Sequence, residues 1–213
     1  MLARRSLVCV SLAAIFASSL WAKDFAKPVA HAAKTYPAHD EHPEEKVAIA
    51  ADPYDTPDKA KIFSINFGEH GLLPVFFIVT NDGEQPISIA NMEVTFTTNN
   101  RSKLTPTAAE DIYRRISNPQ AATRPQVPIP FPRDKVKGAI TDKQRMEVEA
   151  SQFAAKAVEP HTTQSGFMFF DVQGIAAPVA GAHVYITGVD DAKGTELMYF
   201  EIPLEKYLNA PAP

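Results

Sequence analysis

Hydrophobic and polar residues alternate along four short stretches of the chain, residues 62–67, 92–97, 182–189 and 197–204. Successive side chains of a β-strand point to opposite faces of a sheet, so this pattern predicts four strands that each bury one face. In the last stretch the alternation directs four side chains toward the core, namely Met198, Phe200, Ile202 and Leu204. A short edge strand is also expected at residues 47–49.

Two further stretches, Leu73–Thr80 and Gly166–Val172, are apolar on both faces. Strands of this kind lie within a sheet that is covered from both sides. A plain sandwich of two sheets leaves its outer faces in water, so these strands require an additional cover. We expect the helices predicted between residues 98 and 160 to supply it, and a docked partner protein is the alternative.

Residues 98–160 interrupt the strand pattern and form a predicted insertion. A short helix is predicted over residues 108–116, and Thr141 with Gln144 forms a capping box that predicts the start of a second helix. Residues 118–138 between them are basic and rich in proline, which is typical of extended, polyproline-like chain. Pro160 is expected to end the second helix, whose hydrophobic face is formed by Met146, Ala150, Phe153, Ala154 and Ala157.

Three motifs mark the turns and entries of the predicted strands. One strand ends in Val79-Thr-Asn-Asp-Gly83 and is followed by Gln85-Pro-Ile87, whereas Glu159-Pro160 leads into Ser165–Asp171. These motifs resemble exported bacterial immunoglobulin-like domains of uncharacterised function, over roughly residues 62–204. The resemblance implies an all-β fold: an immunoglobulin-like antiparallel sandwich of six to seven strands with a helical, proline-rich insertion. It also implies a non-catalytic binding module of the envelope or cell surface.

The N-terminus has the features of an export signal. Arg4 and Arg5 precede an apolar run, Leu7–Leu20, which is short for a membrane span, and Ala22 is a small residue at the expected cleavage position. We therefore predict a signal peptide at residues 1–22, with a retained anchor as the alternative. The mature protein is expected to be periplasmic or extracellular and to have no membrane span.

Three parts are predicted to follow the signal: a flexible leader at 23–45, the immunoglobulin-like domain at 46–208 and a tail at 209–213. The leader is rich in Ala, Pro, His and acidic residues and has no apolar periodicity, which favours flexibility. Cys9 is the only cysteine of the chain and lies within the signal. The mature protein is therefore expected to contain no disulfide and no thiolate nucleophile.

The distribution of charge points to a candidate binding surface in the insertion. The whole chain carries a net charge of −4, which becomes −6 without the two signal arginines, yet residues 101–145 carry ten Lys and Arg against four Asp and Glu. Such a basic segment could bind an unknown protein or an anionic envelope component, or it could serve only to neutralise an acidic sandwich. Nucleic acid is not expected, because the protein is exported and stacking aromatics are not interleaved. The candidate residues are Arg114, Arg115, Arg124, Phe131, Arg133, Lys135 and Lys137.

Other candidate chemistry is weaker. The leader histidines His31, His39 and His42 could hold a metal ion, which makes a periplasmic metal-handling protein the alternative function, but their irregular spacing and the entropy cost of ordering a flexible segment favour a solvated linker. His161 lies close to Ser165, but the sequence between them has no nucleophile elbow. We therefore predict no enzymatic activity and no cofactor, and a non-enzymatic exported module for binding or assembly.

Overall fold

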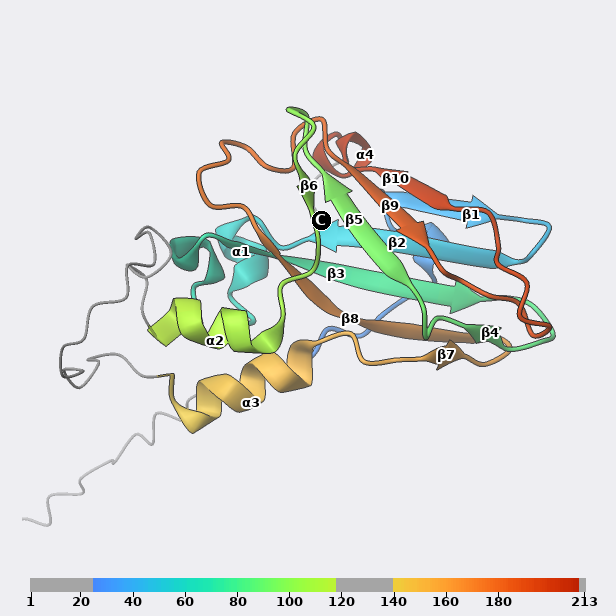
Figure 1. The fold of residues 1–213 in the computed structure, drawn as a ribbon, viewed down its shortest axis with the longest axis horizontal. Coiled ribbons are helices and arrows are strands. Elements are labelled where there is room, and N and C mark those ends of the chain that lie inside the picture. The colour runs from blue at the N-terminus through green and yellow to red at the C-terminus, as the bar shows by residue number, and fades with distance from the viewer. Residues whose placement is uncertain (1–24, 118–139, 211–213) are drawn as a thin grey trace, which may run out of the picture.

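The computed structural model describes residues 25–117 and 140–210, and this part of the chain is mostly β (Figure 1). Its strands are β1 (His39–His42), β2 (Val47–Pro53), β3 (Leu72–Asn81), β4 (Ile87–Ser88), β5 (Glu93–Thr97), β6 (Lys103–Leu104), β7 (Ala157–Val158), β8 (Thr162–Asp171), β9 (His183–Thr187) and β10 (Phe200–Pro203). Its α-helices are α1 (Pro57–Ala60), α2 (Ala109–Ser117), α3 (Asp142–Ser151) and α4 (Glu205–Leu208), and two 3₁₀ turns are η1 (Ala33–Thr35) and η2 (Phe67–His70).

The described strands form three antiparallel sheets. The first sheet has the order β1-β2-β3-β8, the second has the order β10-β9-β5-β6, and β4 pairs with β7 in a small third sheet. β3 pairs with β8 along its whole length, from Leu72 opposite Asp171 to Asn81 opposite Thr162. The predicted all-β class is confirmed at this level, whereas the immunoglobulin-like topology stays a prediction.

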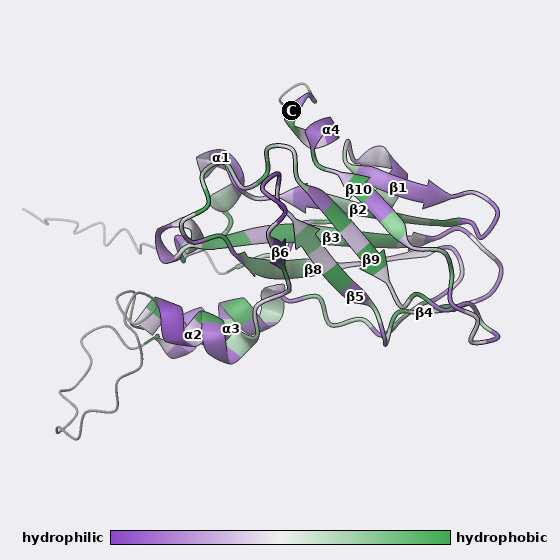
Figure 2. Cartoon of the chain, turned by 45° about the horizontal axis from the view of Figure 1, so that its top comes forward, coloured by the Kyte–Doolittle hydropathy of each residue, from purple (hydrophilic) through white to green (hydrophobic). Residues whose placement is uncertain are grey.

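The two large sheets face each other across a shared hydrophobic core. Val75, Phe77 and Val79 of β3 belong to the same buried cluster as Val94 of β5 and Ile186 of β9. Since side chains alternate along each strand, the inner faces of both sheets contribute to this cluster. The alternation predicted within residues 92–97 and 182–189 is therefore confirmed along β5 and β9, where Figure 2 shows hydrophobic and polar residues in alternating bands.

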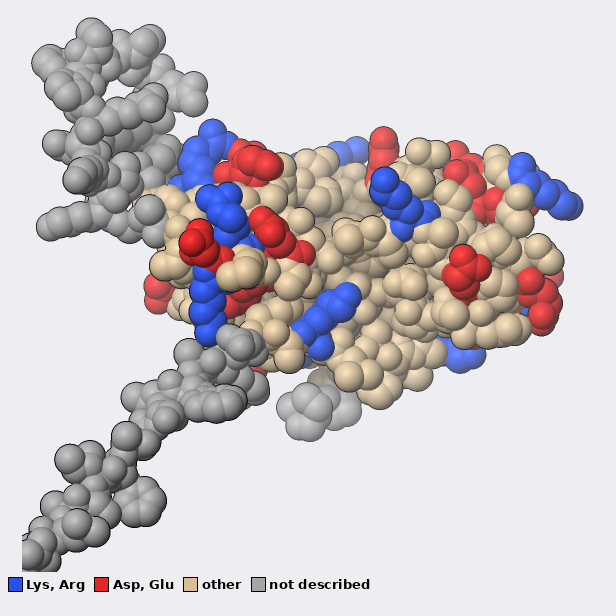
Figure 3. All heavy atoms as spheres, turned by 90° about the horizontal axis from the view of Figure 1, so that it is seen from below, with Lys and Arg blue, Asp and Glu red and all other residues tan. Residues whose placement is uncertain are grey.

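A second hydrophobic cluster lies on the outer face of the first sheet. This agrees with the prediction that strands with two apolar faces need a cover on the outer face. Phe76 of β3 and Phe167 of β8 pack there with Ile112 of α2 and Val148 of α3. The expected helical cover is therefore confirmed, with further residues contributed by segment 62–67 and by the N-terminal segment. The surface of this helical side mixes Lys and Arg with Asp and Glu (Figure 3).

Residues 62–67 contribute to this cover without forming the predicted strand. Phe63, Ile65 and Phe67 are buried as expected, but the segment is irregular and runs into η2. Its rings pack directly on the sheet, with the Phe63 and Phe167 ring centres 4.9 Å apart. The alternation therefore predicted the burial of these three side chains correctly. The segment is nevertheless not a strand, because it pairs with no neighbouring strand in the described part of the chain.

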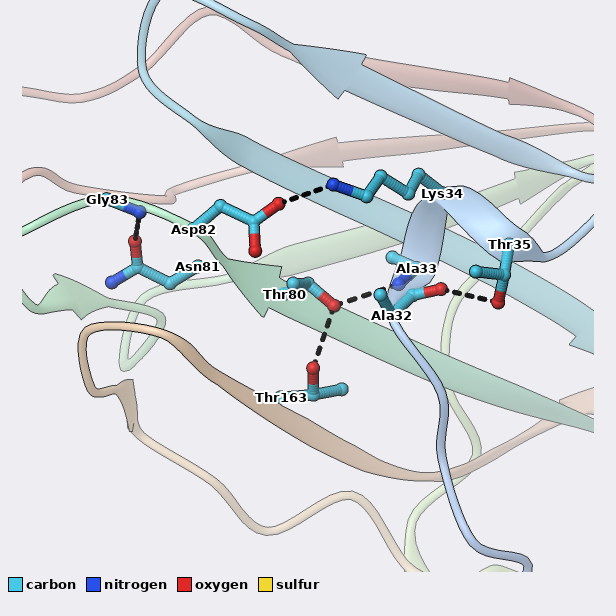
Figure 4. A network of polar contacts seen from close by, with 9 residues as sticks. All are labelled: Ala32, Ala33, Lys34, Thr35, Thr80, Asn81, Asp82, Gly83 and Thr163. Atoms are coloured by element: carbon cyan, nitrogen blue, oxygen red, sulfur yellow. Dashed lines mark hydrogen bonds and ion pairs between the residues drawn. The ribbon is translucent and has the colours of Figure 1, made fainter.

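The described N-terminal segment contacts the domain through η1 and β1, within the range that the sequence predicts to be a flexible leader. β1 pairs with β2, which is consequently an inner strand and not the expected edge strand. The backbone N–H of buried Ala33 donates to Thr80 Oγ1 at 2.9 Å, and Lys34 reaches Asp82 at 3.0 Å (Figure 4). Local composition does not reveal these contacts, because their partners Thr80 and Asp82 lie 47 and 48 positions away along the chain.

α3 begins as predicted but buries a different face. Thr141 forms the capping box with Gln144, whereas Met146 is 60% exposed and the buried positions include Glu147 and Val148. The helix ends at Ser151, after which the chain is extended and approaches Gly166 of β8, where a Cβ would lie 2.4 Å from the Phe153 Cα. The predicted continuation to residue 157 is therefore wrong.

The last strand is shorter than predicted. Phe200, Ile202 and Leu204 are buried as expected, but β10 begins only at Phe200 and Met198 is 71% exposed. The preceding residues form an irregular hairpin, in which the Leu197 N–H donates to the Val189 carbonyl oxygen at 2.8 Å. Met198 therefore points away from the core, contrary to the alternation.

Candidate functional site

The described part of the predicted basic surface is held by ion pairs within the protein. Arg114 pairs with Asp111 one turn earlier in α2, and Arg115 forms a two-pronged pair with Asp171, with Nη1 2.9 Å from Oδ1. Both guanidinium groups thus already have carboxylate partners. The other predicted residues of this surface, Arg124, Phe131, Arg133, Lys135 and Lys137, lie outside the described residues.

Arg115 also lines a hollow of about 370 Å³ beside η2 and the end of β8. Gly71 shapes its rim, since it has a φ of 68° and a Cβ there would lie 2.9 Å from the Gln173 Cβ. The Nδ1 atom of His70 is buried and has no hydrogen-bond partner within the described structure. The pairing of Arg115 with Asp171 neutralises the main charge of this hollow, which weakens it as an anion site.

The three leader histidines make separate contacts. His39 Nδ1 lies 2.6 Å from the Tyr36 carbonyl oxygen, and the ring of His42 stacks on Phe200 with 3.9 Å between ring centres. His31 precedes η1, where its backbone N–H donates to the Tyr36 hydroxyl. Across residues 25–117 and 140–210, no group of three or more His, Cys, Asp or Glu side chains is arranged to hold a metal ion.

A hollow that sequence reasoning did not find lies where β1 meets β10. These two strands are edges of different sheets and lie side by side, and the Glu201 N–H donates to Asp40 Oδ2 at 2.8 Å. The hollow has a volume of about 420 Å³. Its lining, which we call the β1–β10 site, consists of Asp40, His42, His183, Met198, Tyr199, Glu201, Pro203 and Lys206.

The strand register gathers the polar groups of the β1–β10 site. Glu201 lies opposite Tyr185, and Pro203 lies opposite His183, so the three polar side chains share the outer face of the second sheet. The Tyr185 hydroxyl donates to Glu201 Oε1 at 2.8 Å, a bond that raises the pKa of Tyr185. His183 Nδ1 lies 3.0 Å from the same oxygen but is not aligned for a hydrogen bond, so we treat this contact as electrostatic only.

Three rings form a row beside the hollow. The ring centres of His183 and Tyr185 are 6.3 Å apart with nearly parallel planes, and those of Tyr185 and Tyr199 are 6.4 Å apart. Tyr199 is 52% exposed, and its neighbour Met198 is the more exposed of the two. The β1–β10 site therefore combines aromatic faces, a thioether and charged groups on an open part of the surface.

The sequence contained only a partial signal for this site. The alternation predicted over residues 182–189 implies that His183 points away from Val184 and Ile186, and in the structure those two neighbours are buried whereas His183 is partly exposed. The contribution of Met198 was missed because alternation assigned it to the core. The meeting of Asp40 with Glu201 joins residues 161 positions apart, which no local pattern reveals.

Comparisons with known proteins leave the family of this chain open. No known protein family matches the sequence, and no curated protein matches it. One solved structure, a predicted lipoprotein (YcdA) from Bacillus subtilis, is similar at 12% identity with a TM-score of 0.36. That match covers 80% of this chain and 39% of the other, and a likeness at this level supports no argument about fold or function. The resemblance to immunoglobulin-like domains therefore stays a prediction.

Within residues 25–117 and 140–210, no helix is both long and apolar enough to cross a membrane.

Proposed function

We propose that this protein is an exported, non-enzymatic binding module with an immunoglobulin-like sandwich, and that the β1–β10 site is its binding surface. Export is supported by the basic, apolar and small-residue pattern of residues 1–22. The sandwich is supported by two four-stranded antiparallel sheets that share one core. The binding role is supported by the exposed residues of the β1–β10 site.

The single observation that carries this proposal is the exposure of Met198 and Tyr199 next to each other. They are 71% and 52% exposed, although large apolar side chains usually gain free energy by burial. Both border a hollow that also contains charged groups, and binding surfaces commonly combine an apolar or aromatic centre with a polar rim. In this proposal the exposed pair is the apolar centre, and the charged groups of the hollow are the polar rim, of a surface that a partner covers.

Arg114 and Arg115 are already paired, so the basic segment remains a second candidate surface through its other charged residues. The metal-handling alternative gains no support from the contacts of the three leader histidines, which differ for each residue. Calorimetric titration with zinc, copper and nickel tests that alternative directly. Metal-specific heat that is lost on replacing all three histidines would favour it over the β1–β10 site.

The proposal is tested by the binding of purified protein to envelope fractions from its native cells. A variant that carries Met198→Ala and Tyr199→Ala removes the exposed pair and is expected to bind about tenfold less tightly. Met146→Ala is the matched control, because Met146 is similarly exposed but lies on α3. Equal binding by the double variant and the unchanged protein would refute the proposed surface.

A further inference from the structure

We infer that the ligand of the β1–β10 site is a neutral carbohydrate. This inference rests on the proposed function, since it names the chemical class that the proposed surface binds. It starts from the lining of the hollow, which includes two carboxylates, an ammonium group, two imidazoles and a phenol. These groups surround an exposed thioether and an exposed aromatic ring.

The lining offers both hydrogen-bond donors and hydrogen-bond acceptors. Asp40 and Glu201 supply carboxylate acceptors, whereas Lys206 and the Tyr199 hydroxyl supply donors. Sugar hydroxyl groups donate and accept at the same time, so each finds a complementary group in such a lining. Hydrogen bonds to charged groups contribute more than bonds between neutral groups, which suits a ligand that carries many hydroxyls but no charge.

The charges of the lining disfavour an anionic ligand. The hollow has two carboxylates against one ammonium group, so an anion would be repelled by Asp40 and Glu201. The carboxylates are also partly satisfied within the protein, because Asp40 accepts from the Glu201 N–H and Glu201 accepts from the Tyr185 hydroxyl. A neutral polar ligand can use their remaining lone pairs without meeting a repulsive charge.

The row of aromatic rings suits the apolar face of a sugar ring. A pyranose ring presents C–H groups on its face and hydroxyls around its rim, so its face can pack on an aromatic ring while its rim bonds to polar groups. Tyr199 is half exposed, and Tyr185 lies next to it in the row. This arrangement places stacking surface and hydrogen-bonding groups at one location.

The site is held largely in place before a ligand arrives. Tyr185 and Glu201 lie opposite each other in paired strands and are joined by a hydrogen bond. The ring of His42 is stacked on buried Phe200, which holds this lining residue of the hollow in place. Groups that are already ordered lose little conformational entropy on binding, which favours recognition of a small, weakly interacting ligand.

The test is calorimetric titration of the exported protein, purified from cells that express the full chain. The probes are neutral tetrasaccharides of glucose, mannose and N-acetylglucosamine, with the anionic tetrasaccharide of galacturonic acid as comparator. We expect saturable binding of at least one neutral probe and binding of the anionic probe that is at least about tenfold weaker. Tyr199→Ala is expected to weaken binding of the neutral probe by about tenfold, whereas Met146→Ala is expected to leave the affinity for this probe unchanged.

Two results would overturn the inference: no binding of any neutral probe at about 10 mM, or equal affinity of Tyr199→Ala and the unchanged protein. Thermal unfolding of each variant establishes that the substitutions leave the protein folded. If the sugars fail but envelope binding still depends on Met198 and Tyr199, the carbohydrate inference is wrong and the proposed function stands. If envelope binding is also independent of these two residues, both are wrong.

Discussion

Thr80 joins three separate parts of the chain through one hydroxyl group. Its Oγ1 accepts the N–H of Ala33 at 2.9 Å and lies 2.9 Å from the Thr163 Oγ1, so it links the N-terminal segment to β3 and β8 (Figure 4). Ala33 is fully buried, so its N–H has no access to water in place of this bond. Thr80 is thus one of several attachments of a segment whose sequence is typical of a flexible leader.

Replacing this hydroxyl is expected to destabilise the protein. Thr80→Val leaves the buried Ala33 N–H without an acceptor, which should lower the free energy of unfolding by about 1–3 kcal/mol. Urea denaturation measures this change, and hydrogen exchange of the Ala33 amide should become faster. Thr163→Val is the control, because it removes one hydroxyl partner but leaves the Ala33 bond intact; equal stability of both variants would contradict this role.

Among the elements, α3 shows which features a sequence can predict. Its start was predicted correctly because the capping box depends only on Thr141 and Gln144, which lie within one turn. Its buried face was predicted wrongly because Glu147 accepts the Ser64 N–H at 2.8 Å, a partner 83 positions away. A carboxylate therefore occupies the inner face where hydrophobic periodicity had assigned Met146.

The bond between Glu147 of α3 and Ser64 can be tested by substitution. Glu147→Ala removes the acceptor for both the N–H and the hydroxyl of Ser64, and it should lower the free energy of unfolding by about 1–3 kcal/mol. Glu149→Gln is the control, since Glu149 is exposed on the same helix and a glutamine can still accept the hydrogen bond from the Tyr113 hydroxyl, so stability should change by less than about 0.5 kcal/mol. Similar effects of the two substitutions in chemical denaturation would argue against a buried anchor at Glu147.

The strands were predicted well where burial is regular along the sequence. β3 is buried at every position, and its neighbour β8 shares the outer hydrophobic cluster. Predictions failed where a segment is buried without strand pairing, as at residues 62–67, or leaves the pattern in a hairpin, as at Met198. Apolar periodicity reports which side chains avoid water, but it does not report which backbone groups find partners.

For the molecule as a whole, the C-terminal helix is attached to the first half of the chain by a tyrosine. The Tyr207 hydroxyl donates to Asp55 Oδ1 at 2.6 Å, and the Lys59 Nζ lies 4.3 Å from the centre of the Tyr207 ring. Burial, followed by the bond to Asp55, raises the pKa of Tyr207 above its ordinary value of 10.0. The neutral phenol is therefore favoured in the folded state.

This shift predicts a loss of stability in alkali. Because the folded pKa is raised, the contribution of Tyr207 is complete below pH 10 and declines as the pH rises above it. Tyr207→Phe should lower the free energy of unfolding at pH 7 by about 0.5–1.5 kcal/mol, and the difference from the unchanged protein should shrink above pH 10. Denaturation at several pH values tests this, and a difference that grows above pH 10 would contradict it.

At the same scale, the β1–β10 site depends on the meeting of two sheets. β1 comes from the segment predicted to be a leader, and β10 comes near the C-terminus, so the site exists only when both ends of the described chain are in place. Local sequence patterns cannot predict such a junction. The described charges of the predicted basic surface, in contrast, have partners within α2 and β8.

The central claim is that a ligand covers the β1–β10 site, and photocrosslinking in the native cells tests it most directly. A photoreactive residue replaces Met198 in one variant and Met146 in another, because both methionines are exposed but lie on different parts of the surface. We expect adducts from position 198 that disappear when Tyr199→Ala is added, and no matching adducts from position 146. Adducts that form equally from both positions, or only from position 146, would contradict it.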